Sequence, residues 1–237
     1  MTTLLTMNRM NGRIPFLALL LLCLWAACSE DEYHYPSVQL EFLTAATGSD
    51  GTIRQVTTDA GDTWPVLTDR SALRTTPDSL LRVVSNYLLT TDASGRQGAE
   101  LYAVSKAVAP FPKPAAEFKQ GVKTDGVELI SSWMGHGYFN LVLSIKQQSK
   151  THRLHFVEQE VTSDLATGRC HLSLLLYHDA DQDVEAYSKR AYLSVPLAPY
   201  LTPGITQVEV SLTYTDYQSR QQTVTATYLP TDASALR

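Results

Sequence analysis

The second half of the chain is a series of short apolar segments separated by turns, and this pattern constrains its fold more than any other feature. Alternate residues from Phe139 to Ile145 are apolar, so in an extended strand they share one face. The same alternation places Cys170 and Leu172 together, which predicts that Cys170 is a small buried side chain. The expected strands lie at residues 126–133, 138–147, 152–162, 169–178, 187–195, 206–215 and 221–229. Strands of this number and spacing predict an antiparallel β-sandwich over residues 115–237.

Residues 37–109 contain a second group of β-rich segments. They lie at 38–47, 52–57, 80–90 and 99–108, and turns rich in glycine and aspartate separate them. About five strands in roughly 75 residues are typical of a small barrel, so an OB-like domain is predicted here. The prolines of residues 110–114 favour a stiff linker between this domain and the sandwich. Both domains are therefore expected to be all-β.

Residues 1–27 have the features of a signal peptide that is removed from the mature protein. The only charged residues in this segment are two arginines, and its apolar run at 16–27 is shorter than the roughly 20 residues of a membrane-spanning helix. Two small alanines precede Cys28, as at a lipoprotein cleavage site between Ala27 and Cys28. We predict that Cys28 is acylated and anchors the protein in a membrane. The alternative is an ordinary secretion signal followed by an incidental cysteine.

An acidic tether, residues 28–36, follows the signal peptide. Its sequence Ser-Glu-Asp-Glu at 29–32 resembles the export signal of surface lipoproteins in the Bacteroidetes. This resemblance implies a lipid anchor in the outer membrane and a body that faces outward. The alternative is a solvated tether that carries no export signal, in which case the protein could instead face the periplasm.

The charge of the chain argues against one class of partner. The chain has 19 basic and 24 acidic residues, and removing the two arginines of the signal peptide leaves a net charge of −7. Neutralisation of phosphates supplies most of the affinity for nucleic acids, so no nucleic-acid partner is predicted. Apart from Cys28, only Cys170 remains in the mature chain, so no intramolecular disulfide is expected.

The histidines do not predict a metal site. His152 and His155 are three residues apart on an expected strand, so their side chains point to opposite faces and cannot share an ion. A hairpin between residues 152–162 and 169–178 would place His152 opposite His178. A third ligand is not evident, and we expect surface histidines.

One acidic segment begins like a calcium-binding loop, with Asp179, Asp181 and Asp183 at alternate positions. Val184 stands where the sharp turn of such a loop requires glycine, and Arg190 stands where the loop requires glutamate. We predict a solvated hairpin turn, with a non-standard calcium site as the alternative. No metal and no cofactor are expected.

The remaining motifs point to binding rather than to catalysis. Gly135 and Gly137 predict a tight turn that would expose His136, which could touch a ligand. The chain has no G-x-S-x-G motif and no supported cysteine–histidine pair, so no catalytic residue is predicted. Several tyrosines could form a protein- or glycan-binding surface, with ordinary strand positions as the alternative. They are Tyr33, Tyr35, Tyr214, Tyr217 and Tyr228.

A family resemblance covers nearly all of the mature chain. The cysteine after the signal, LLRVVSNYLL at 80–89, the proline break, WMGHGYFNLVLSIK at 133–146 and AYLSVPL at 191–197 resemble the NigD-like lipoproteins of the Bacteroidetes. The resemblance implies an OB-like domain followed by a β-sandwich. The family name implies an association with a bacteriocin locus and with immunity, and it supplies no catalytic residues.

The sequence therefore leaves three candidate functions. The first is a non-enzymatic surface module that binds an unknown protein or glycan. The second is a bacteriocin-associated immunity protein, which only the resemblance implies. The third is an unrecognised hydrolase, which would need clustered acids with perturbed pKa values in a cleft.

Overall fold

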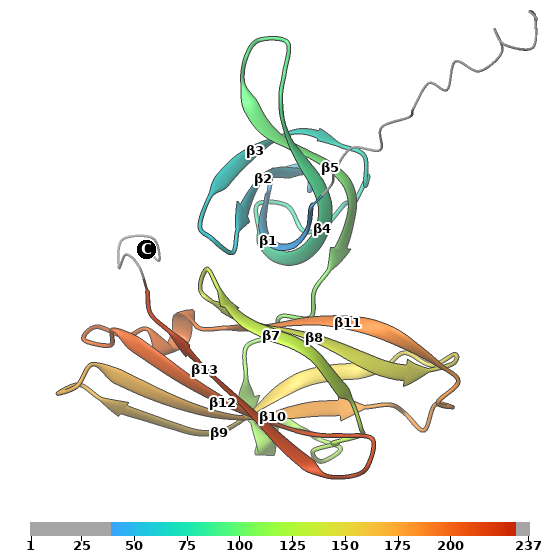
Figure 1. Cartoon of the computed structure of the whole chain (residues 1–237), viewed down its shortest axis with the longest axis vertical. Helices are drawn as coiled ribbons and strands as arrows, with labels where there is room; N and C mark the ends of the chain where they lie inside the picture. The colour runs from blue at the N-terminus through green and yellow to red at the C-terminus, as the bar shows by residue number, and fades with distance from the viewer. Residues whose placement is uncertain (1–38, 231–237) are drawn as a thin grey trace, which may run out of the picture. The chain divides into compact units, whose positions relative to one another are not determined.

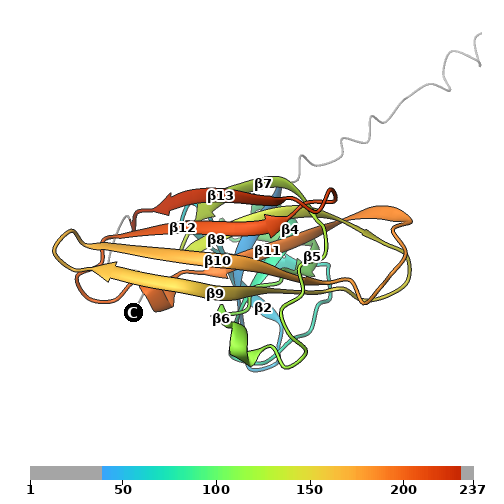
Figure 2. The same ribbon diagram turned by 90° about the horizontal axis from the view of Figure 1, so that it is seen from below.

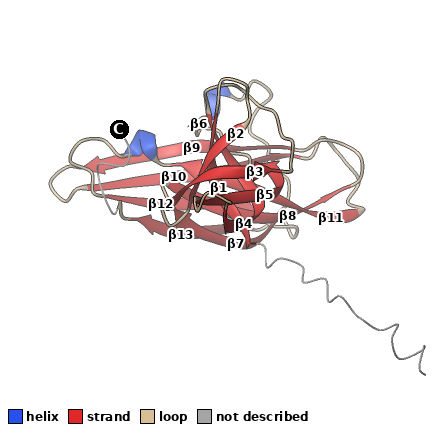
Figure 3. Cartoon of the chain, turned by 90° about the horizontal axis from the view of Figure 1, so that it is seen from above, coloured by secondary structure: helices blue, strands red, loops and turns tan. Residues whose placement is uncertain are grey.

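The described part of the chain consists almost entirely of β-strands. The computed structural model describes residues 39–230, so the predicted signal peptide, Cys28, Tyr33 and Tyr35 lie outside it. Within this range the only helices are two single 3-10 turns, as Figure 3 shows. The predicted all-β architecture, a small barrel followed by a β-sandwich, is confirmed. No helix in residues 39–230 is long and apolar enough to span a bilayer.

The first five strands close into a barrel, which Figure 1 shows as a ring. They are β1 (Gln39–Thr47), β2 (Ile53–Thr58), β3 (Thr63–Asp69), β4 (Leu80–Thr91) and β5 (Gln97–Lys106). Their order around the barrel is β1-β2-β3-β5-β4, and all pairs are antiparallel except β3 with β5. Inward-pointing residues, among them Leu43, Val83 and Leu101, are fully buried and form the barrel core.

The segment predicted as a linker is hydrogen-bonded to the sandwich. The N–H of Val108 donates to the carbonyl of Tyr192 (2.8 Å), and the N–H of Ser194 donates to the carbonyl of Val108 (2.9 Å). The short strand β6 (Lys113–Pro114) then pairs in parallel with β9 at the sheet edge. Proline lacks the N–H that a central strand needs for its hydrogen bonds, so within a sheet it is tolerated at the edge. The chain is thus tied to the sandwich from Val108 onward.

Two sheets form the sandwich. Its longer strands are β7 (Glu128–Gly135), β8 (Tyr138–Gln147), β9 (Arg153–Asp164), β10 (Arg169–Asp179), β11 (Tyr187–Pro196), β12 (Gln207–Thr215) and β13 (Gln221–Tyr228). One sheet has the order β13-β12-β10-β9-β6, seen side by side in Figure 2, and the other has the order β11-β8-β7. The 3-10 turns η1 (Ala115–Glu117) and η2 (Ala198–Tyr200) flank β6 and β11.

The pairing in the sandwich is antiparallel with two exceptions. Strand β10 pairs in parallel with β12, and β6 pairs in parallel with β9. The first exception arises because the chain crosses to the other sheet as β11 before it returns as β12. The predicted antiparallel sandwich is thus present with two parallel pairs that the sequence did not indicate, because alternation within one segment does not reveal which strand lies next to it.

The facing sheets bury the residues that the alternation indicated. Phe139, Leu141 and Ile145 of β8 lie in the core between the sheets. Cys170 is buried beside them on β10, as predicted, and it is a free cysteine. Removal of these apolar surfaces from water is the main favourable term that holds the sandwich together.

Candidate functional site

A buried arginine joins the barrel to the sandwich. Val83 and Tyr87 of β4 point into the barrel, so the alternation of the strand directs Arg82 outward. The Arg82 side chain is nevertheless only 1% exposed, because the sandwich covers it. Its Nη2 donates to Asn140 Oδ1 (3.0 Å) and its Nε donates to Ser194 Oγ (3.3 Å). An arginine buried in this way requires a carboxylate partner.

Asp59, in the turn between β2 and β3, supplies that carboxylate. Its Oδ1 accepts a hydrogen bond from Nη2 of Arg82. Its Oδ2 accepts from Nε1 of Trp133 (2.9 Å) and from Nδ2 of Asn140 (2.8 Å). Both oxygens of Asp59 are therefore occupied, and the ion pair links the barrel turn to β7 and β8.

Glycine allows the close approach at this junction. A Cβ atom at Gly135 would overlap the carboxylate of Asp59, so a larger residue there would displace it. The turn from Gly135 to Gly137 is tight, as predicted, with Gly137 at φ +77°. His136 lies against Gly61 of the barrel turn, where a Cβ would be 3.3 Å from Nδ1 of His136. This histidine thus contacts the barrel, a role that the sequence did not indicate.

Aromatic rings surround the guanidinium of Arg82. It lies over the ring of Tyr138 at 4.3 Å and near that of Phe42 at 5.5 Å. The ring of Phe42 makes edge contacts with Trp133 (5.2 Å between centroids) and with Tyr192 (5.8 Å). Cation–π and edge-to-face contacts add to the ion pair and hold these rings in fixed orientations.

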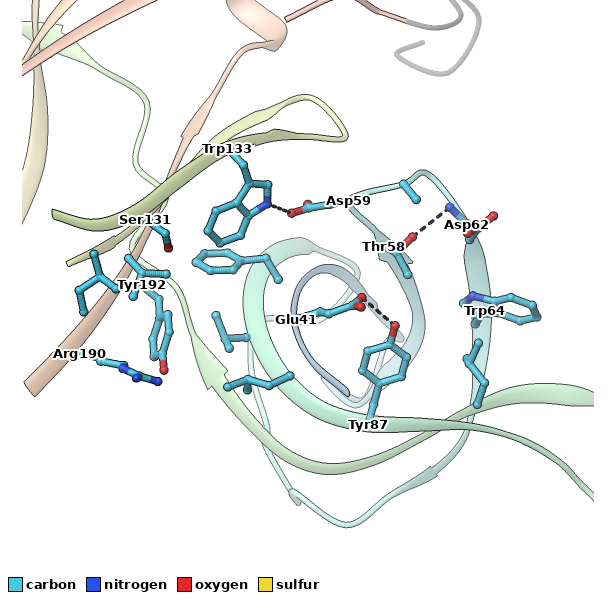
Figure 4. Close-up of a pocket in the computed structure, with 17 residues that line it drawn as sticks. Glu41, Thr58, Asp59, Asp62, Trp64, Tyr87, Ser131, Trp133, Arg190 and Tyr192 are labelled. Carbon is cyan, nitrogen blue, oxygen red and sulfur yellow. Dashed lines mark hydrogen bonds between the residues drawn. The ribbon is translucent and has the colours of Figure 1, made fainter. Parts of the chain in front are cut away.

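A cleft of about 650 Å³ opens beside this cluster, between β1, β4 and the β2–β3 turn of the barrel and β7, β8 and β11 of the sandwich. Figure 4 shows its aromatic and charged walls. The aromatic residues are Phe42, Trp64, Tyr87, Trp133 and Tyr192, and the charged ones are Glu41, Asp59, Asp62 and Arg190. This volume and apolar lining suit a small ligand or a short segment of a partner.

The polar groups of the cleft differ in how far they are satisfied. The phenol of Tyr87 donates to Oε2 of Glu41 (2.9 Å). Burial raises the pKa of Tyr87, and the hydrogen bond to Glu41 raises it further, so the phenol stays neutral. Within residues 39–230, the side chains of Asp62 and Arg190 make no hydrogen bond or ion pair, and no cation pairs with Glu41.

The structure brings His152 and His178 together, as the hairpin interpretation indicated. Nδ1 of His152 lies 2.9 Å from Nε2 of His178, and Nδ1 of His178 faces the carbonyl oxygen of Asp125 at 3.0 Å. Burial lowers the pKa of His178, and the neighbouring His152 lowers it further. The side chain of His152 is buried, so the expectation of surface histidines is wrong for this pair. His155 lies elsewhere, against the ring of Phe118.

The aspartates at and after the end of β10 stabilise the connection to β11, which is not the predicted hairpin turn, because β11 pairs with β8 in the other sheet. Burial opposes the ionisation of Asp183, but the backbone N–H groups of Gln148, Ser149 and Lys150 outweigh it and hold its pKa well below the usual range. Asp179 accepts from the N–H of Asp181 (2.9 Å) and from Arg153, and these bonds lower its pKa. A hollow of about 470 Å³ adjoins these residues. Carboxylates with lowered pKa values are poor general acids, and within residues 39–230 no histidine, cysteine and carboxylate group is arranged to hold a metal ion.

Of the described tyrosines singled out in the sequence, Tyr214 and Tyr217 line one hollow of the sandwich, whereas Tyr228 lies at the other end of β13. The hydroxyl of Tyr228 accepts from the N–H of Gly137 (3.1 Å), and that of Tyr217 accepts from the N–H of Lys146 (2.6 Å). Tyr214 packs against the sandwich core. The aromatic cleft is formed by other residues, and the signal that could have located it is Arg82, a charge inside the apolar segment LLRVVSNYLL.

Comparisons with known proteins identify the family to which this architecture belongs. Residues 110–228 match the NigD-like C-terminal beta sandwich domain. The crystal structure of a NigD-like immunity protein from Bacteroides caccae is 35% identical in sequence, covers 84% of this chain and 100% of that chain, and has a TM-score of 0.68. No curated protein sequence matches the chain.

More distant structures share the fold alone. A protein of unknown function from Bacteroides vulgatus is 15% identical, covers 82% of this chain and 92% of that chain, and has a TM-score of 0.61. A candidate lipoprotein from Bacteroides fragilis is 11% identical, covers 84% of this chain and 100% of that chain, and has a TM-score of 0.56.

Proposed function

Because the chain belongs to the NigD-like family, we propose that it is a non-enzymatic binding protein whose partner occupies the aromatic cleft. The observation that carries this proposal is that some charged groups of the cleft are engaged by the protein itself and others are not. The polar groups of Arg82 and Asp59 are fully engaged and fix the walls, whereas Asp62 and Arg190 face the cleft with no partner in residues 39–230. Fixed apolar walls with a few available charges are the composition of a binding site.

The same groups argue against catalysis in the cleft. The carboxylate of Asp59 is committed to Arg82, Trp133 and Asn140. The neutral phenol of Tyr87 is a weak nucleophile with no base beside it other than Glu41, to which it already donates. A hydrolase would need an acid–base pair aimed at a common point, and the described walls of the cleft do not supply one.

We place this binding protein at the cell surface, held by a lipid on Cys28. The cleavage site before Cys28 and the acidic tether support this placement, and the candidate lipoprotein from Bacteroides fragilis has the same fold. A lipid anchor followed by an acidic tether would present the cleft to partners outside the membrane.

One comparison favours a particular form of this function, namely immunity. The relative that covers 84% of this chain at 35% identity is a NigD-like immunity protein. An immunity protein acts by binding, so the general binding function and the immunity function both place the partner in the cleft. In this form of the proposal, the partner in the cleft is a bacteriocin.

A cleft-blocking variant tests the proposal. Ser131 lines the cleft and is exposed, so Ser131→Trp should fill the space without removing a native contact. Ser163→Trp makes the same change on the exposed end of β9, outside the cleft. A deletion strain is complemented with each variant and challenged with bacteriocin-producing neighbours. Wild type and Ser163→Trp should restore survival, and Ser131→Trp should not.

Two results would count against the proposal in different ways. Full rescue by Ser131→Trp would show that the cleft is not where the partner binds. Equal survival of the deletion strain and the wild type under challenge would argue against immunity and leave the binding function to be tested with the probes described below.

A further inference from the structure

The cleft has walls that favour one class of ligand. We infer that its natural occupant is a peptide segment that carries basic and aliphatic side chains, an inference that rests on the proposed binding function of the cleft.

Exposed aliphatic side chains border the cleft. Leu40, Leu89 and Ile130 all line it, and they are 51%, 41% and 48% exposed. Large apolar side chains gathered at one site mark a surface that a partner covers. Sugars offer hydroxyl groups that need hydrogen-bonding partners, and leucine and isoleucine supply none. A peptide with aliphatic side chains would bury these residues.

The carboxylates select a cation. Glu41 on β1 and Asp62 in the β2–β3 turn both line the barrel wall of the cleft, where Figure 4 shows them. Neither pairs with a cation among residues 39–230, unlike Asp59, which is paired with Arg82. Because apolar walls lower the local dielectric constant, a lysine or arginine of the ligand would be attracted more strongly here than at an open surface.

Arg190 lies on the wall of the cleft opposite Glu41 and Asp62, so the two walls carry opposite charges. It belongs to β11 of the sandwich and lines the cleft next to Tyr192. A ligand with its cation toward Glu41 and a carboxylate or carbonyl group toward Arg190 would satisfy both walls. A peptide backbone with a basic side chain offers both kinds of group, and aromatic side chains such as Trp64 can stack on either.

The charges disfavour occupants supplied by the protein itself. The acidic tether at 28–36 carries the same charge as Glu41 and Asp62. A second copy of the mature chain, with a net charge of −7, would also be repelled. A separate basic partner is the occupant that electrostatics favours.

Tryptophan fluorescence provides a selective assay for this ligand. Trp64 and Trp133 both line the cleft, and they are the only tryptophans outside the signal peptide. The first probe is an acetylated, amidated peptide of alternating lysine and leucine. The comparison probes are its glutamate–leucine and lysine–serine counterparts and the neutral sugar cellohexaose.

We expect the lysine–leucine peptide to change the fluorescence with saturation, and both altered peptides to bind much more weakly. The double variant Glu41→Gln/Asp62→Asn should weaken its binding about three- to tenfold at low salt. This difference should shrink as the salt concentration rises. Glu117→Gln/Glu160→Gln makes the same charge change at exposed positions outside the cleft and should leave binding unchanged.

Several results would overturn the inference. Binding of cellohexaose without the peptide would show that the ligand is a glycan, and a dimer that Ser131→Trp disrupts would show that the occupant is a second copy. If no probe binds but Ser131→Trp still abolishes rescue under challenge, the inference fails and the proposed function stands. If Ser131→Trp also rescues fully, both fail.

Discussion

Loss of the buried charge of Arg82 should destabilise the protein strongly, because it leaves Asp59 without its counter-ion. Replacement by methionine keeps an unbranched apolar chain against Tyr138 and Phe42 but removes the charge. Removing one partner of a buried ion pair costs about 3–5 kcal/mol. Asp59 is 21% exposed and retains its bonds from Trp133 and Asn140, so we expect the lower end, about 3 kcal/mol.

A double-mutant cycle separates this effect from lost packing. Asp59→Asn alone leaves the 1% exposed Arg82 without its counter-ion and should also cost about 3 kcal/mol. The double variant Arg82→Met/Asp59→Asn contains neither charge. The double variant should therefore be more stable than the sum of the single changes predicts, by about 2 kcal/mol or more. The measurement is the free energy of unfolding from urea titrations of the mature chain at pH 7.

The control is Arg96→Met, which breaks the exposed pair of Arg96 with Asp92 in the β4–β5 turn. It should leave the free energy of unfolding nearly unchanged, because solvent screens such a pair. A loss below about 1 kcal/mol in Arg82→Met, together with additivity in the cycle, would refute the reasoning. It would mean that water already solvates Asp59 and that the ion pair does not hold the junction.

Four single-residue changes test the lipid anchor, the junction, the sandwich core and the buried histidine. Cys28→Ala should abolish labelling by a lipid precursor and release the protein from the membrane fraction; unchanged labelling would exclude Cys28 as the anchor. Gly135→Ala should lower stability by about 1–3 kcal/mol, because its methyl group overlaps the Asp59 carboxylate, and an unchanged melting temperature would contradict this. Cys170→Ser should cost roughly 1–3 kcal/mol in urea unfolding, since it buries a hydroxyl in the sandwich core, and a neutral effect would count against that burial. Because folding lowers the pKa of His178, the unfolded chain takes up its proton first as the pH falls below about 6.5. Stability should therefore fall between pH 7 and 5, and His178→Asn should reduce this fall; equal slopes would refute the assignment.

Local patterns predict the long strands of the sandwich and four of the five barrel strands, but they miss β3, whose segment contains Pro65. Alternation from Phe139 to Ile145 identified the core face of β8, and the position of Cys170 identified that of β10. The neighbours of each strand could not be predicted in this way, because alternation is a property of one segment. The parallel pairs β3–β5 and β10–β12 depend on crossovers that no single segment records.

The candidate site was largely beyond such patterns, since its residues are far apart in the chain. Asp59, Arg82, Asn140 and Ser194 come from separate segments and meet only because the barrel packs on the sandwich. Arg82 was visible as a charge within an apolar strand, yet its partner was not. The pairing of His152 with His178 was predictable because a hairpin is local, with strands that follow each other in sequence.

Photo-crosslinking in living cells tests most directly whether the cleft is the binding site. A photoreactive phenylalanine analogue replaces Ser131, within the cleft, or Ser163, outside it. After illumination of cells grown with their natural competitors, the adduct is isolated and its partner is identified by mass spectrometry. We predict one adduct from position 131, formed with a basic, aliphatic-rich peptide segment, and none from position 163. Equal adducts at both positions, or an adduct only at position 163, would contradict the assignment of the cleft.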